Sequence, residues 1–126
     1  MNAVTVQLHA LAHARSGDKG NRSNISVIAF DARAWDALLA QVTEARVHEL
    51  FAARRPTRTT RYVLPKLHAM NFVLDDILDG GVNASLNLDT HGKTLSSLML
   101  TLPVRLDAAL ARELAQVPAE PHQETP

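Results

Sequence analysis

A chain of 126 residues lies in the size range of a single domain and can bury a modest hydrophobic core. Hydrophobic residues make up 46% of it, and 13 basic residues balance 13 acidic ones, which excludes a charge-driven disordered chain. Because the sequence has no cysteine, disulfides, thiolate catalysis and cysteine-ligated metal centres are excluded as well. We expect one domain at residues 1–117 and a polar tail at residues 118–126.

The first quarter of the chain shows two strand patterns with a polar segment between them. Residues 4–11 alternate apolar and polar side chains at period two, which predicts a half-buried strand. Residues 24–30 form a nearly continuous apolar run, with Ile25 and Val27 on one face, and this predicts a central strand. Residues 14–24 are expected to form a polar loop that joins the two strands.

Two helices and a third strand are predicted next. Asp31 can accept hydrogen bonds from the free backbone N–H groups at the start of a helix over residues 34–40. Thr43 begins a second helix, whose apolar residues have helical spacing and which Pro56 ends. Residues 59–64 combine Thr, Arg, Tyr, Val and Leu, and they are predicted to form a strand.

The second half of the chain is predicted to contain a long helix, a hairpin and a short helix. Apolar residues at helical spacing predict a helix over residues 66–78. Residues 84–89 and 93–102 are predicted to pair as a hairpin, and residues 107–116 to form a C-terminal helix. Strands and helices in this order do not form a regular β-α-β alternation. We therefore expect an α+β fold with a mostly antiparallel sheet of about five strands and two helical regions on one face.

The predicted polar loop carries most of the candidate binding groups. Gly17 and Gly20 permit tight turns and a close approach of the backbone, and Lys19 can donate to an anion or a carbonyl oxygen. The spacing is neither that of a Walker motif nor that of a dinucleotide fingerprint. An anion cradle and ordinary turn chemistry both remain open. The candidate ligand-binding residues are Arg15, Ser16, Gly17, Asp18, Gly20, Asn21 and Asn24.

A second candidate site begins at the predicted helix over residues 66–78. His68 and Asn71 are three residues apart and would share one helical face, where an imidazole beside an amide could polarise a carbonyl or shuttle a proton. A histidine that merely caps the junction between strand and helix is the structural alternative. We take His68, Asn71 and Lys19 as the candidate catalytic residues.

Other classes of site and partner are not expected. His9 and His13 share a strand face, but no third ligand has suitable spacing, so we expect no metal site, and no motif identifies a cofactor. The arginines of residues 54–61 lack interleaved aromatic residues, which argues against nucleic-acid binding. The sequence has neither a run of about 18 apolar residues nor a basic signal segment, so we expect a cytoplasmic protein without membrane contact.

Three segments of the chain carry a resemblance to a known family. They are residues 14–21 (ARSGDKGN) leading to Asn24–Ile25, residues 64–73 (LPKLHAMNFV), and residues 85–93 (SLNLDTHGK). In this order and spacing, over residues 8–104, they resemble the small C-terminal domain of AtuA-type acyclic terpene utilisation proteins. The resemblance implies a ferredoxin-like α+β fold and association with a larger AtuA-type N-terminal domain. It also implies a place near acyl-CoA catabolism, in the breakdown of citronellol, geraniol and related branched compounds.

Two functions of different classes follow. The chain is expected to be an accessory or small subunit of an acyl-CoA or terpenoid catabolic enzyme, with Arg15, Lys19 and Asn21 binding an anionic or acyl-CoA ligand. His68 and Asn71 would then orient a carbonyl. In the alternative, the chain is a non-catalytic module for oligomerisation or protein interaction, and its polar loop lies in an interface between copies. A small-molecule sensor domain is a third possibility.

Overall fold

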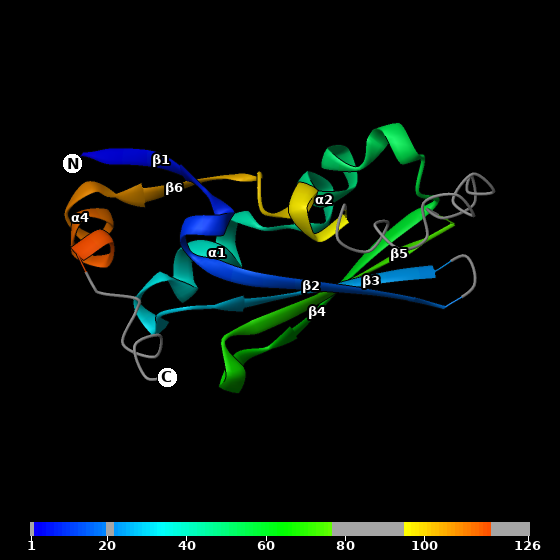
Figure 1. The fold of residues 1–126 in the computed structure, drawn as a ribbon, viewed down its shortest axis with the longest axis horizontal. Helices are drawn as coiled ribbons and strands as arrows, with labels where there is room; N and C mark the ends of the chain where they lie inside the picture. Colours follow the sequence, from blue (N-terminus) through cyan, green and yellow to red (C-terminus); the bar gives the residue numbers. More distant parts are fainter. Residues whose placement is uncertain (1, 20–21, 77–94, 117–126) are drawn as a thin grey trace, which may run out of the picture.

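A four-stranded antiparallel sheet is the centre of the computed structural model, which describes residues 2–19, 22–76 and 95–116 (Figure 1). In spatial order its strands are β2 (Ala12–Lys19), β3 (Arg22–Ala29), β5 (Ala69–Asp75) and β4 (Arg58–Leu64). Because β5 is antiparallel to both of its neighbours, β3 and β4 run parallel with β5 between them. This is the split β-α-β arrangement of ferredoxin-like folds.

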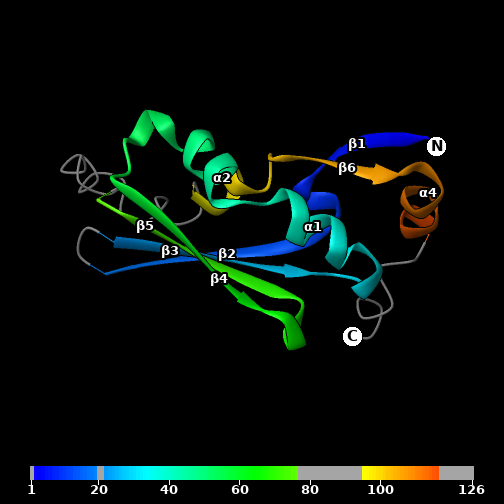
Figure 2. The same cartoon turned by 180° about the vertical axis from the view of Figure 1, so that it is seen from behind.

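Helices cover one face of this sheet. The connection from β3 to β4 contains α1 (Trp35–Gln41) and α2 (Glu44–Leu50), which lie on the same side of the sheet in both views (Figures 1 and 2). Residues 95–99 are also helical. Short 3₁₀ helices complete the described connections: η1 (Leu8–Ala10), η2 (Ala32–Ala34), η3 (Ala52–Arg54) and η4 (Pro65–Leu67). The predicted mostly antiparallel sheet with helices on one face is confirmed.

A separate two-stranded ribbon lies on the helical side. It pairs β1 (Ala3–Gln7) with β6 (Pro103–Asp107), and α4 (Ala108–Gln116) follows directly (Figure 1). Val104 and Leu106 of this ribbon are buried in the same hydrophobic cluster as Leu38 of α1 and Phe72 of β5. One core therefore extends from the large sheet through the helices to the ribbon.

The core-facing side of the sheet follows from alternation along its central strands. In β3, Ile25 and Val27 are fully buried, whereas Asn24 between the buried Ser23 and Ile25 is exposed. In β5, Phe72 and Leu74 are fully buried under the helices. Since successive side chains of a strand point to opposite faces, the polar residues of both strands gather on the other face.

Several predicted elements are confirmed by the structure. β3 contains nearly all of the predicted strand at residues 24–30, and Asp31 accepts a hydrogen bond from the backbone N–H of Arg33 at 2.8 Å where the α1 region begins. Thr43 caps α2 in the same way, through the N–H of Arg46 at 3.3 Å. β4 and α4 lie close to their predicted ranges. The predicted first strand is shorter, since β1 ends at Gln7 and a 3₁₀ helix follows.

The predicted polar loop is wrong in its secondary structure. Residues 12–19 and 22–29 form a long hairpin, so the chemistry-bearing segment is strand for most of its length. A strand at the edge of an antiparallel sheet has one side in contact with solvent, where polar side chains are tolerated. The hydrophilic composition of this segment therefore reflects the amphipathic edge strand β2 and the polar start of β3.

The predicted helix over residues 66–78 is also wrong. Pro65 begins a 3₁₀ helix that ends at Leu67, the following His68 reverses the chain with a φ of 50°, and β5 begins at Ala69. Met70 and Leu74 fit the spacing of a helix, but with Phe72 they also fit the period-two spacing of a strand. Strands on both sides supply hydrogen-bond partners for the whole backbone of residues 69–75. This pairing favours a strand over a helix at these residues.

The predicted hairpin is contradicted on one arm. Residues 95–99 are helical rather than extended, and Pro103 begins β6 instead of ending a strand. The other arm, residues 84–89, lies outside the described residues, as do Ile77 and the predicted tail at residues 118–126.

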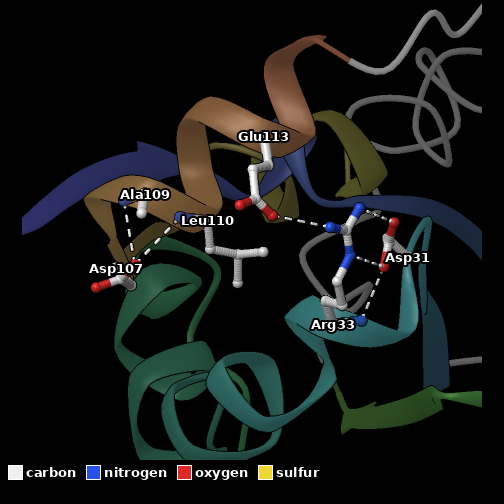
Figure 3. A network of polar contacts seen from close by, with 6 residues as sticks. All are labelled: Asp31, Arg33, Asp107, Ala109, Leu110 and Glu113. Carbon is white, nitrogen blue, oxygen red and sulfur yellow. Dashed lines mark hydrogen bonds and ion pairs between the residues drawn. The ribbon is translucent and has the colours of Figure 1, made fainter.

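Polar side chains join the outer elements to one another. Arg33 links Asp31 to α4 by ion pairs of 3.0 Å with Asp31 Oδ2 and with Glu113 Oε1 (Figure 3). The hydrogen bonds from the guanidinium and backbone N–H of Arg33 hold the pKa of Asp31 below its ordinary value. At the start of α4, Asp107 Oδ2 accepts from the N–H groups of Ala109 and Leu110, each at 3.1 Å.

Arg61 ties the junction between α1 and α2 to the sheet. It lies on the core-facing side of β4, and its Nη1 donates to the carbonyl oxygens of Leu39 and Val42, each at 2.8 Å. Its backbone N–H donates to Glu44 Oε2 at 2.8 Å. A cation that donates to the last carbonyls of a helix satisfies groups that have no partner within the helix.

We expect Arg61→Leu to lower the free energy of unfolding by about 2 kcal/mol, because two carbonyl oxygens lose a charged donor. Urea denaturation followed by circular dichroism measures this change. Arg58→Leu is the matched control, since Arg58 lies on the opposite face of the same strand, is exposed, and should change stability by less than about 0.5 kcal/mol. Equal effects of the two substitutions would contradict the assigned role of Arg61.

Candidate functional site

The candidate site lies on the face of the four-stranded sheet that points away from α1 and α2, which we call the open face. None of the described helices lies over it in either view (Figures 1 and 2). The strand register places side chains of the open face in rows that cross the sheet. The donor row consists of Arg15, Ser26, Asn71 and Tyr62, and the apolar row beside it of His13, Ile28, Ala69 and Leu64. A third row, on the other side of the donor row, consists of Gly17, Asn24, Val73 and Thr60.

Asn71 is the centre of the hydrogen bonds on the open face. Its Oδ1 accepts from the hydroxyl of Ser26 at 3.2 Å and from Asn24 Nδ2 at 3.4 Å. Because both donors meet the same oxygen, the Nδ2 group is directed away from them. Nδ2 has no hydrogen-bond partner among the described residues. The Asn71 side chain is thus held in place through Oδ1, and its NH₂ group is available to donate to a ligand.

Gly17 makes room for this arrangement. A Cβ atom at position 17 would lie 3.1 Å from Asn24 Oδ1, closer than ordinary van der Waals contact. The hydroxyl of the buried Ser23 donates to the carbonyl oxygen of Gly17 at 3.1 Å and holds the glycine backbone beside β3. Gly17 therefore acts by its small size, which lets the Asn24 side chain lie across β2 while it bonds Asn71.

The described charges of the open face are mainly positive. Arg22 Nε contacts Asp75 Oδ1 at 2.7 Å, and this hydrogen bond, followed by the charge of Asp75, raises the pKa of Arg22. Arg15 and Arg58 are exposed, and neither has an ion pair or hydrogen bond with any described residue. A chain of zero net charge thus places unpaired cations on one surface. Such a surface attracts anions.

One end of the open face is apolar. We call Phe30, Leu64 and Leu67 the apolar end; their exposed fractions are 54%, 45% and 66%. Phe30 follows β3, and the other two lie at the end of β4 and in the 3₁₀ helix after it. The ring of His13 contacts Phe30 edge-on, with ring centroids 4.4 Å apart. Exposed apolar side chains that gather on one surface mark an interaction site more often than single ones do.

The comparisons with known proteins decide the family. The family model of the AtuA ferredoxin-like domain matches residues 6–105, which include every residue of the three rows. The chain belongs to the AtuA ferredoxin-like domain family. No significant match was found among the curated proteins or the solved structures. The predicted resemblance and the ferredoxin-like fold are confirmed.

The predicted binding residues of this AtuA ferredoxin-like domain are partly brought together. Arg15, Gly17 and Asn24 lie on the open face. Arg15 is in the same row as Asn71, and Gly17 and Asn24 are in the row beside it. Ser16 lies on the other side of β2, opposite the buried Ile25. The side chains of Asp18 and Lys19, together with residues 20–21, lie outside the described part of the chain. Whether any of these residues binds a ligand or takes part in catalysis stays a prediction.

His68 and Asn71 do not share a helical face, because no helix forms there. The ring of His68 packs 5.7 Å from the ring of Trp35, between centroids, and so lies on the side of α1. Asn71 points to the open face. His68 and Asn71 therefore lie on opposite sides of the sheet and do not face the same group.

Ser26 and Tyr62 belong to the same rows and were missed by sequence reasoning. The signal for Ser26 is the alternation of polar Arg22, Asn24 and Ser26 with apolar Ile25 and Val27 along β3, whereas the place of Tyr62 follows from the pairing of β4 with β5. A strand assignment for residues 69–75 would have placed Asn71 in phase with them. Among the described residues, no three His, Asp or Glu side chains are grouped to hold a metal ion, and no described helix is long and apolar enough to cross a membrane.

We expect the cost of Gly17→Ala to depend on the side chain of Asn24. In the wild type the new Cβ displaces the Asn24 amide, which offsets the gain of about 0.5–1 kcal/mol that alanine gives over glycine in a strand. In the Asn24→Ala background nothing is displaced, so Gly17→Ala should stabilise the protein. A double-mutant cycle by urea unfolding measures the difference. If Gly17→Ala changed the free energy of unfolding equally in the wild type and in the Asn24→Ala variant, the small size of Gly17 would not be required by the Asn24 side chain.

Proposed function

We propose that the chain is the small accessory subunit of a cytoplasmic enzyme whose larger component is an AtuA-type protein, and that this enzyme degrades acyl-CoA or terpenoid compounds. Membership of the AtuA ferredoxin-like domain family supports the choice of partner. The observation that carries the docking role is the apolar end of the open face, where Phe30, Leu64 and Leu67 are 45–66% exposed. Burial of such side chains against a partner is a main source of association free energy.

The charge nearest the apolar end describes the partner surface. Arg15 lies in the row beside His13, Ile28 and Leu64 and has no ion pair with a described residue, so the complementary surface would present a carboxylate next to its apolar side chains. Arginine is favoured at interfaces because its planar guanidinium binds carboxylates with two hydrogen bonds. The electrostatic part of the association should weaken as the salt concentration rises.

The candidate catalytic residues Asn71 and His68 would have different roles in this enzyme. Asn71, with Arg15 in the same row, is available to orient a carbonyl or anionic group on the open face. His68 lies on the side of α1, so it would act on a different group. Reconstituted enzyme with Asn71→Ala, His68→Ala or Lys19→Ala, the third candidate catalytic residue, separates these roles, because a residue that contacts the substrate should lower turnover while the complex still forms.

We expect the chain to co-purify with an AtuA-type protein from the same genome, and Leu67→Glu to weaken this complex about tenfold or more, because a charge enters an apolar contact. Isothermal titration calorimetry and light scattering measure the affinity and the stoichiometry. Val4→Glu is the matched control, since Val4 is 39% exposed on β1 and does not belong to the large sheet.

Three results distinguish the proposal from its alternative. A tight complex that Leu67→Glu weakens and Val4→Glu leaves intact supports a docking subunit. Equal effects of the two substitutions, or no complex at all, contradict it. If the pure chain instead has the mass of a dimer and Leu67→Glu converts it to a monomer, the open face is an interface between copies, and the oligomerisation module is the better account.

A further inference from the structure

The donor row carries more hydrogen-bond donors than the protein uses. Nδ2 of Asn71, the guanidinium of Arg15 and the hydroxyl of Tyr62 have no hydrogen-bond or ion-pair partner among the described residues. Arg22 on the same face differs, because it is paired with Asp75. Unpaired donors of three kinds, aligned across neighbouring strands, form a surface that is complementary to a hydrogen-bond acceptor.

The geometry of the row limits what it can bind. Neighbouring strands are about 4.8 Å apart, so the Cα atoms of Arg15 and Asn71 are about 10 Å apart, with Ser26 between them. An acceptor group above Ser26 is therefore within reach of the long side chain of Arg15 and of the Asn71 amide. The backbone N–H groups of the central strands are used in the ladders. Only side chains are left to contact the acceptor.

The charge of the row indicates one negative charge on the ligand. Arg15 is its only cation, and its other members are a hydroxyl, an amide and a phenol. A guanidinium with neutral donors suits a planar carboxylate, which accepts two parallel hydrogen bonds from arginine. A phosphate dianion is usually bound by several cations or by free backbone N–H groups, and the donor row supplies neither.

The apolar row indicates what is attached to the carboxylate. Ile28, Ala69 and Leu64 lie two residues further along the same strands, about 7 Å from the donor row. Leu64 is 45% exposed, so its side chain is available for contact. A ligand with a charged head and an apolar chain can place both groups on complementary surfaces.

We propose that the open face binds an aliphatic carboxylate, with its head above Ser26 between Arg15 and Asn71 and its apolar chain along Ile28 and Leu64. This binding is a property of the chain alone and does not depend on the proposed partner. Since each CH₂ group is only half covered on an open sheet face, the affinity should rise about twofold for each added CH₂.

Solution NMR of the full ¹⁵N-labelled chain at pH 7 tests the proposal, with sodium hexanoate as the probe. We expect saturable shifts of the Asn71 side-chain NH₂ and of Arg15 Nε–H, with a dissociation constant about fifteenfold lower than for acetate, which has four fewer CH₂ groups. Methyl phosphate and hexan-1-ol are the comparison probes. At the concentrations at which hexanoate saturates the shifts, methyl phosphate and hexan-1-ol should not shift the signals of the Asn71 NH₂ and Arg15 Nε–H in a saturable way.

Variants assign the site. Asn71→Asp keeps an oxygen to accept from Ser26 and Asn24 but replaces the NH₂ donor, so we expect about tenfold weaker hexanoate binding in a folded protein. Arg15→Gln should give a similar loss. Arg58→Gln removes an unpaired cation outside the donor row and should leave the affinity unchanged.

The proposal is overturned by any of three results. The first is the absence of saturable hexanoate shifts at Asn71 and Arg15. The second is equal affinity for hexanoate and methyl phosphate, which would indicate attraction of any anion. The third is an equal loss for Arg58→Gln and Arg15→Gln, which would indicate a diffuse positive surface.

Discussion

The one-sided burial of the four-stranded sheet is the constraint on which the rest of the structure depends. Ile25, Val27, Phe72 and Leu74 are fully buried under the helices, and the alternation of a strand then sends the intervening residues to the opposite face. A shift of one residue in the register would expose these apolar side chains, so the position of every polar residue on the open face is fixed by the core. The arrangement of the candidate site is a consequence of the packing on the other side.

The open face has three regions with different chemistry. Phe30, Leu64 and Leu67 form the apolar end, the donor row crosses the middle, and Arg22 and Asp75 form an ion pair beyond it. A docked partner on the apolar end would cover a carboxylate bound in the donor row, because the two regions are adjacent. The proposed ligand would then lie between two proteins, where it is removed from water and its hydrogen bonds are stronger.

Local signals predicted part of this structure. Asp31 was recognised as a helix cap and Thr43 as the start of a helix because both signals are local, and residues 24–30 were recognised as a central strand by their apolar run. The strand at residues 69–75 was missed, because Met70 and Leu74 fit either period and the decision came from the two strands beside it. Such long-range pairing leaves no trace in a single segment.

The candidate site was predicted as a set of residues but not as a surface. Arg15, Gly17, Asn24 and Asn71 were chosen for their chemistry, and the register gathers them on one face. His68 was grouped with Asn71 by helical spacing, and the strand separates them. The alternation along residues 22–27 places Ser26 on the polar face of its strand, but only the register of the sheet aligns it with Asn71 and Tyr62.

Both proposed roles of the open face require that it is accessible in the free chain. NMR with a soluble paramagnetic agent measures this directly, through the relaxation of side-chain signals. The structure predicts strong broadening of the methyl signals of Leu64 and Leu67 and of the Asn71 amide, and little effect on Leu74 in the core. If the open-face signals of the monomer were instead as protected as those of Leu74, another part of the chain would cover this face, and its role as a binding surface would be contradicted.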